Sequence, residues 1–165
     1  MQSIILRKMD NFKSGVAVYM TSEIVEIKNR GLLLAIIIPH DYDQFGVSFC
    51  TSGDLSQQLA YMHHPAGHII ESHIHNVVRR EVHYTKETLI LRKGKLRVDF
   101  YDDARSYVES YILTAGDVIL LASGGHGFKV LEEVEMIEVK QGPYAGEGDK
   151  TRFEGVSDDE VRYVR

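Results

Sequence analysis

Histidine is the residue type of this chain that points most directly to chemistry, because six of its eight copies fall between positions 63 and 83. Two of them, His73 and His75, stand one residue apart. In a β-strand, residues two apart share a face, so both imidazoles can reach one metal ion. Such a pair needs further ligands from elsewhere in the fold, because two imidazoles leave a divalent ion mostly hydrated. The spacing therefore indicates a metal site, although a chance cluster of surface histidines explains a bare pair equally well.

The remaining histidines of this stretch divide into two groups. His63 and His64 precede Pro65 in an expected turn, and we interpret them, with His68, as surface residues. His83 alternates with Glu87 along a strand pattern, so both side chains can face the same cavity.

Length and composition limit the possible classes of protein. A chain of 165 residues with 44% apolar and 26% charged residues fits one globular domain with a single core. The net charge of -5 argues against nucleic-acid binding, which requires a basic surface. The single cysteine, Cys50, cannot form an internal disulfide, and we interpret it as a small buried apolar side chain.

No segment has the character of a targeting or membrane sequence. Met1–Met20 mixes charged residues among its apolar ones and lacks the apolar stretch of a secretory signal. The longest apolar run, Leu32–Pro39, is far shorter than the roughly 20 residues that span a bilayer. We therefore expect a soluble, cytoplasmic protein without membrane contact.

Short apolar stretches bounded by turn residues recur along the chain after Met20, which is typical of an all-β sandwich or barrel. Leu96, Val98 and Phe100 alternate with polar residues, which predicts a half-buried strand. Thr51–Ser56 can hold a helical turn, and the tail from Gly142 to Arg165 is expected to wrap the outside or to cross to a partner subunit. The expected strands are Glu23–Lys28, Leu32–Pro39, Gly46–Cys50, Gln57–Met62, His68–His75, Thr88–Leu91, Leu96–Tyr101, Tyr107–Leu113, Val118–Leu121, Phe128–Leu131 and Glu135–Gln141, with turns at Arg92–Lys95, Tyr101–Arg105, Thr114–Asp117 and Ser123–Gly125.

From Gly67 onward, two histidines, a glutamate and a second glycine follow one another at regular intervals. Five residues separate Gly67 from His73, His75 follows, and six residues lie between Glu87 and Gly94. This pattern resembles the first motif of the cupin superfamily. It departs from the family in one place, because eleven residues separate His75 from Glu87 where cupins have three or four. Glu81 and His83 lie in this insertion and are alternatives to Glu87 as the acidic or third ligand.

A second, partial match resembles the second cupin motif. Gly116, Ala122 in place of a proline, Gly124 and His126 follow the family order, with His126 one residue early and no asparagine after it. The resemblance implies a single cupin domain over residues 1–165, a jelly-roll β-barrel with a motif core at about 57–141, N-terminal strands in 17–50 and the tail 142–165. More narrowly, the chain resembles a group of bacterial cupin-domain proteins that accompany nucleotide-sugar and surface-polysaccharide enzymes, so a carbohydrate-related ligand is implied.

The resemblance also implies a ligand set for a divalent transition metal. The four ligands are His73, His75, Glu87 and His126. Three imidazoles and one carboxylate suit iron, manganese, nickel, copper or zinc and leave positions for water or substrate. Side chains that could orient a small ligand are Tyr61, Arg79, Tyr84 and Lys129. The simpler interpretation of each tyrosine is a barrel-wall residue, and that of Arg79 is a solvated surface residue. The same four ligand residues can also serve a barrel that has lost its metal and uses them as hydrogen-bonding contacts for a sugar.

Three functions remain open at this point. The chain can be a metal-dependent enzyme, such as an isomerase, epimerase or oxygenase acting on a small polar molecule. It can be a binding barrel that does no chemistry, or an interaction subunit whose dimer matters more than its cavity. Fold alone does not choose among them, because one fold hosts many activities. By analogy with cupins we expect a homodimer.

Overall fold

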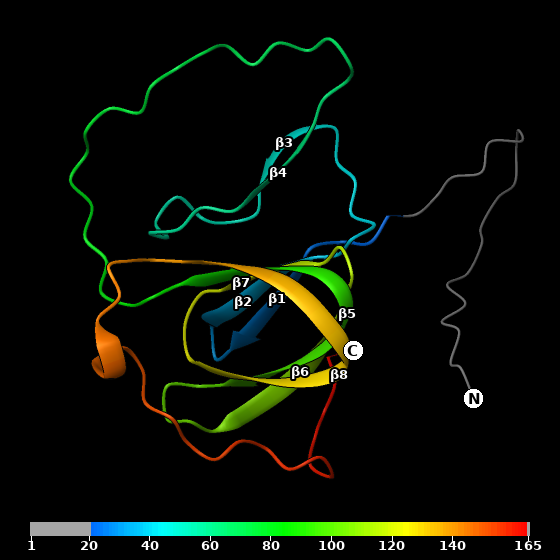
Figure 1. Ribbon diagram of the computed structural model, residues 1–165, viewed down its shortest axis with the longest axis vertical. Helices are drawn as coiled ribbons and strands as arrows, with labels where there is room; N and C mark the ends of the chain where they lie inside the picture. Colours follow the sequence, from blue (N-terminus) through cyan, green and yellow to red (C-terminus); the bar gives the residue numbers. More distant parts are fainter. Residues whose placement is uncertain (1–20, 165) are drawn as a thin grey trace, which may run out of the picture.

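The computed structural model describes residues 21–164, so the segment Met1–Met20 and residues 17–20 of the expected N-terminal strand region lie outside the described part. The described chain is all-β, with eight strands and one four-residue 3-10 helix, η1 (Gly146–Asp149) (Figure 1). The strands are β1 (Val25–Asn29), β2 (Leu32–Ile38), β3 (Gly46–Phe49), β4 (Ala60–His63), β5 (Glu87–Tyr101), β6 (Tyr107–Thr114), β7 (Val118–Leu121) and β8 (Gly125–Lys140). Within residues 21–164 there is no helix with the length and apolar character that crossing a bilayer requires.

Six of the strands form one antiparallel sheet in the order β1-β2-β7-β5-β6, with β8 paired to the other side of β5. The first residues of β5 pair with β7, its last residues pair with β6, and β8 follows it from end to end. This sharing of one long strand curls the sheet into a half-barrel (Figure 1). The expectation of an all-β protein is confirmed.

Two pairs of expected strands are single bent strands in the structure. The predicted turn at Arg92–Lys95 lies inside β5, and the predicted strands Phe128–Leu131 and Glu135–Gln141 are both part of β8. The ladder between β5 and β8 continues through three register shifts between Leu91 and Leu96. Such bulges bend a strand without ending it, which is why glycine here marks curvature and not a hairpin.

The core lies on the inner, concave face of the curled sheet. Leu96, Val98 and Phe100 of β5 point to this face and are buried, as the alternation predicted. The other members of the core cluster come from β1, β2, β5, β6 and β7: Ile27, Leu34, Ala35, Ile37, Leu89, Leu91, Leu113, Ile119 and Leu121. We use "inner face" below for the face that carries this cluster.

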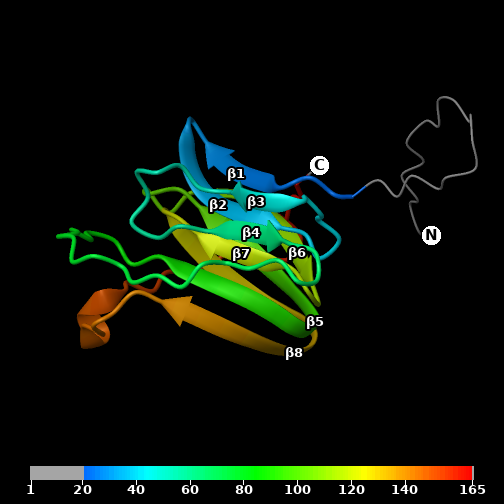
Figure 2. The same cartoon turned by 90° about the horizontal axis from the view of Figure 1, so that it is seen from above.

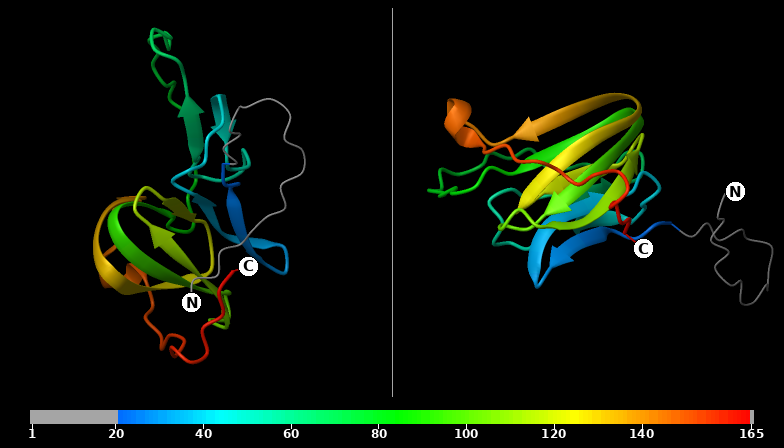
Figure 3. Two further views of the ribbon diagram at one scale, coloured as in Figure 1. Left: turned by 90° about the vertical axis from the view of Figure 1, so that its right-hand side faces the viewer. Right: turned by 90° about the horizontal axis from the view of Figure 1, so that it is seen from below.

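The outer face of β5 is buried as well from Arg97 to Tyr101, which corrects the expectation of a half-exposed strand there. Arg97 and Asp99 are buried beneath the C-terminal tail (residues 142–164), whose Asp158 lies 2.9 Å from the guanidinium of Arg97. The backbone of Ser110 donates to Arg162 and accepts from Val164, so the tail adds a short parallel bridge beside β6. The tail therefore wraps the outside of its own sheet, as seen from below in Figure 3.

The hairpin of β3 and β4 forms a separate two-stranded sheet, and the chain between β4 and β5 extends away from the half-barrel (Figures 1 and 2). The prediction of a strand at His68–His75 is wrong: this stretch has no strand and its residues are exposed. A strand requires a partner, and no described residue pairs with this backbone. Thr51–Ser56 forms turns, closed by a 3.3 Å hydrogen bond from Leu55 N to Ser52 O, and no helix.

Candidate functional site

Glu87 and His126, two of the four expected metal ligands, meet in the structure. Glu87 opens β5 and points to the inner face, as do Leu89 and Leu91 two and four residues later. His126 stands opposite Phe100 at the start of β8, on the same face. Because β5 curls, these two positions approach across the concavity, and His126 Nε2 lies 3.2 Å from Glu87 Oε2.

Two further charged residues, Lys140 and Asp149, extend the contact between Glu87 and His126 into a row of ion pairs. Lys140 Nζ lies 3.2 Å from Glu87 Oε1 and 2.9 Å from Asp149 Oδ2. The hydrogen bond with His126, together with the contact to Lys140, lowers the pKa of Glu87 to about 2 although burial opposes this. The pKa of Lys140 is raised, first by its hydrogen bond with Asp149 and then by that with Glu87. Glu87 is therefore a carboxylate throughout the physiological range, which is the form that binds cations.

His73 and His75 form a second pair, away from the strands. Their ring centroids are 5.2 Å apart in an edge-to-face arrangement, within the exposed chain between β4 and β5. His73 Nδ1 lies 2.9 Å from the carbonyl oxygen of Glu71, which can only accept, so Nδ1 donates and Nε2 carries the free lone pair. The structure thus gathers the four expected ligands into two pairs. Within residues 21–164 it forms no cluster of three or more potential metal ligands.

The alternative ligands and the other histidines lie elsewhere. Glu81 and His83 are exposed in the same extended chain as His73 and His75. His64 and His68 stack on each other with centroids 4.2 Å apart, and His63 Nδ1 lies 2.6 Å from Asp43 Oδ1. None of them contacts the pair of Glu87 and His126 through a hydrogen bond or ion pair in the described chain.

The four side chains expected to orient a ligand are dispersed. Tyr61 of β4 donates to Asp43 over 3.3 Å, and Arg79 and Tyr84 are exposed in the extended chain. Lys129 stands opposite Arg97, hence on the outer face of β8, where it binds Asp158. Lys129 therefore stabilises the tail and points away from the face that carries His126.

Several residues of this site were not predicted from the sequence. Lys140 reaches Glu87 because β8 pairs with β5 in one register, and Asp149 reaches Lys140 because the tail then turns back, which no local pattern reveals. Phe128 and Val130 follow His126 at two-residue spacing, so alternation along β8 could have assigned them to the inner face. Both are substantially exposed, at 41% and 56%. The polar side chains around Glu87 therefore lie on the same face as two apolar side chains that the described chain leaves largely exposed.

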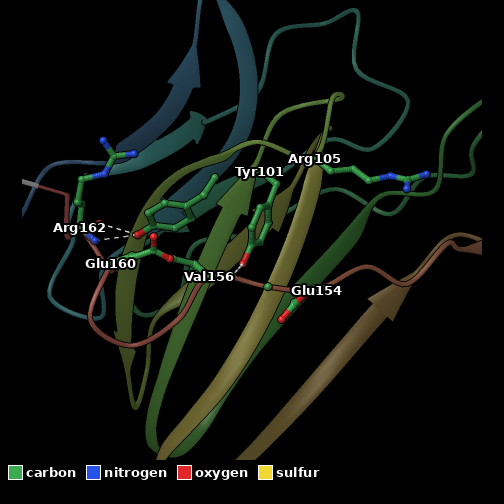
Figure 4. A pocket seen from close by; sticks show the side chains of 8 residues that line it. Tyr101, Arg105, Glu154, Val156, Glu160 and Arg162 are labelled. Atoms are coloured by element: carbon green, nitrogen blue, oxygen red, sulfur yellow. Dashed lines mark hydrogen bonds between the residues drawn. The ribbon is translucent and has the colours of Figure 1, made fainter.

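A different hollow opens on the outer side, between the strands β5 and β6 and the tail, with a volume of about 520 Å³ (Figure 4). Tyr101 Oη accepts a hydrogen bond from Val156 N and Tyr107 Oη accepts one from Arg162 N, so the two phenols dock the tail. The remaining lining residues are Arg105, Glu154, Gly155 and Glu160. Its charges balance and its phenols are already engaged, so this hollow shows no preference for a ligand of one charge.

Comparison of the chain with protein-family models, with curated proteins and with solved structures gave no match. The functional conclusion therefore depends on the residues of the inner face and on their geometry.

Proposed function

We propose that the chain is a cupin-type jelly-roll protein that holds a divalent transition metal ion with Glu87, His126, His73 and His75, and binds a small polar, carbohydrate-related ligand beside it. The observation that carries this proposal is the contact of Glu87 with His126 on the inner face. It brings together an acid and an imidazole from the two separate motifs that resemble cupin motifs. The expected metal is iron, manganese, nickel, copper or zinc.

The separation of the two side chains supports this assignment. Two ligand atoms bound at about 2.1 Å to one ion lie about 3.0 Å apart at right angles and about 3.4 Å apart in a tetrahedron. The 3.2 Å between Glu87 Oε2 and His126 Nε2 falls between these values. Glu87 is already ionised, and Lys140 occupies its other oxygen and fixes the orientation of the carboxylate.

His73 and His75 have the donor chemistry that the set still lacks. The carbonyl contact of His73 Nδ1 leaves Nε2 for the ion, which is the arrangement usual in metal-binding histidines. The proposal requires the extended chain to move its pair of imidazoles onto an inner face. When bound, the metal would polarise a carbonyl or hydroxyl of the ligand or activate a water molecule, which suits an isomerase, an epimerase or an oxygenase.

A second function is favoured by a separate observation. Glu87 has both oxygens satisfied, one by Lys140 and one by His126, in the described chain itself. A barrel that binds a sugar without metal can use such a preformed group of donors and acceptors and do no chemistry. The first function requires that the metal content of the protein depends on Glu87 and His126. The second requires that the protein binds its ligand without metal.

Elemental analysis of protein purified without an affinity tag separates the two. The first function predicts about one transition metal ion per chain, lost in Glu87→Gln and in His126→Ala. His68→Ala is the matched control, since His68 only stacks on His64 and should keep the metal. Unchanged metal content in both site variants would rule out the ligand set. Metal-free protein that still binds a sugar by calorimetry would establish the second function.

A further inference from the structure

The chain between β4 and β5, residues 64–86, is called the arm below. We propose that two copies of the protein exchange their arms, so that each arm covers the inner face of the other copy. The arm then delivers His73 and His75 to Glu87 and His126 of the second copy, which deepens the proposed function and rests on it for this last step. The exchange itself depends only on the shape and surface of the arm and of the sheet.

The arm carries apolar side chains that nothing in the described chain covers. Ile74 is 88% exposed and Val77 is fully exposed, and Ile69, Ile70 and Val78 are exposed as well. A contiguous set of exposed apolar residues on a soluble chain marks an interaction surface. Between residues 69 and 85 the described chain forms no backbone–backbone hydrogen bond, and the Glu71 carbonyl is the backbone group bound by a side chain, that of His73. The other backbone donors and acceptors of this stretch are therefore available for pairing.

The sheet presents a matching uncovered surface. Phe128, Val130 and Met136 lie on the inner side of β8 and are 41%, 56% and 42% exposed. β8 pairs only with β5 in the described chain, so its other edge is an unpaired strand edge. An extended arm can cover the apolar residues and pair with this edge at the same time.

Charge favours the arm as the segment that covers β8. The arm has three basic residues, Arg79, Arg80 and Lys86, against two acidic ones, and it also contains five histidines. β8 has four glutamates against two lysines. Glu132 and Glu133 bind Lys95 and Lys93 of β5, so Glu135 and Glu138 are the glutamates of β8 that have no ion pair in the described chain. The two segments are therefore of opposite net charge, whereas β8 placed against β8 of another copy would bring like charges together.

The geometry of the arm favours a second copy over the arm's own sheet. Both ends of the arm are fixed, at β4 and at β5, and from there it projects beyond the half-barrel in two perpendicular views (Figures 1 and 2). A projecting element beside an uncovered surface that it complements is the arrangement from which two identical chains form a closed pair by exchange. In a dimer with a two-fold axis, each arm makes the same contact with the inner face of the other copy, so neither arm remains unbound.

Sedimentation of the full chain tests the exchange without reference to metal. The wild type should be a dimer, and Ile74→Ser/Val78→Ser should be a monomer with an unchanged circular dichroism spectrum. Val47→Ser/Met62→Ser, which changes exposed apolar residues of the β3 and β4 hairpin, is the matched control and should remain a dimer. A monomeric wild type, or a dimer lost only in the hairpin variant, would overturn the exchange.

Mixed dimers test which copy supplies each ligand. Chains carrying His73→Ala/His75→Ala and chains carrying Glu87→Gln/His126→Ala are produced together under two tags, and the mixed dimer is isolated and its tags removed. In a mixed dimer with exchanged arms, the unmutated arm of one chain lies against the unmutated sheet of the other, so one of the two sites is complete. The mixed dimer should then hold about one metal ion, while each variant alone holds none. A mixed dimer without metal, beside a wild type that binds metal, would show that each arm serves its own sheet. A dimeric wild type without metal would instead reject the proposed function and leave the exchange standing.

Discussion

Gly94 of β5 lies directly against Glu133 of β8: a Cβ atom at position 94 would be 1.9 Å from the carbonyl oxygen of Glu133. Gly94 also has a φ of +82°, a conformation that side chains with a Cβ rarely adopt. The close contact falls among the register shifts where β5 and β8 bend together. This glycine therefore permits the curvature that brings Glu87 and His126 into contact.

We expect Gly94→Ala to destabilise the protein by about 2 to 4 kcal/mol, because the methyl group forces the two backbones apart and strains the left-handed residue. Urea unfolding followed by circular dichroism measures the change. Gly148→Ala is the control, since nothing lies within 4 Å of its added Cβ and its backbone is not in the left-handed region. Equal unfolding midpoints for the two variants would show that the bend does not require glycine.

The buried ion pair beneath the tail gives a second prediction. Arg97 Nη2 donates to Asp99 Oδ2 over 3.0 Å, and Ser110 Oγ donates to the other oxygen of Asp99. Arg97→Met should cost about 3 to 5 kcal/mol because it leaves the Asp99 carboxylate buried without its cation. The double variant Arg97→Met/Asp99→Leu should cost less than the single one, because it removes the charge that lacked a partner. Denaturant unfolding of both variants checks the order, and a double variant at least as unstable as the single one would contradict it.

Local patterns in the sequence were sufficient to predict most of the strands. The alternation around Leu96 placed a strand and its apolar face correctly, since both depend on neighbours in sequence. The burial of Arg97 could not be predicted, because it depends on Asp158 returning from the tail. A strand at His68–His75 was expected from its side chains alone, but a strand forms only where a partner backbone is available.

The candidate site shows the same division. The resemblance to the two cupin motifs implied Glu87 and His126 as ligands, and the structure brings these two side chains together. Lys140 was not named, because its contact with Glu87 follows from the register of two strands that bend along their whole length. The ligand set of four and the identity of the ion stay predictions. Residues joined by pairing across long chain separations are thus the part of the site that spacing does not reveal.

Acid should release the tail. The hydrogen bonds from Lys129 and Arg97 lower the pKa of Asp158, so its folded pKa lies below the usual value of about 3.9. Its contribution to tail docking is therefore complete above that usual value and is lost as the pH falls through the lowered pKa. Hydrogen exchange, corrected for the intrinsic rate at each pH, should show lower protection factors for the Val164 and Val156 amides once the pH has fallen below this lowered pKa than at neutral pH.

Asp158→Asn should show the same fast exchange at neutral pH and little further change in acid. Asp159→Asn, one residue along the tail, is the control and should resemble the wild type. Protection of the two amides that stays unchanged in Asp158→Asn would show that the tail is held by its backbone bridge to Ser110 and by the phenol of Tyr101, and not by the charge of Asp158.

Removal of metal gives the last prediction. A ligand that binds only the folded state raises the unfolding temperature, so protein isolated with metal should unfold at a lower temperature after dialysis against a chelator. His126→Ala should unfold at one temperature before and after dialysis, because the variant has no ion to lose. Lys140→Met separates the role of the ion from that of the ion pair: it removes a contact of Glu87 but no proposed metal ligand, so the effect of the chelator should persist. A chelator effect of equal size in the wild type and in His126→Ala would place the ion elsewhere in the chain.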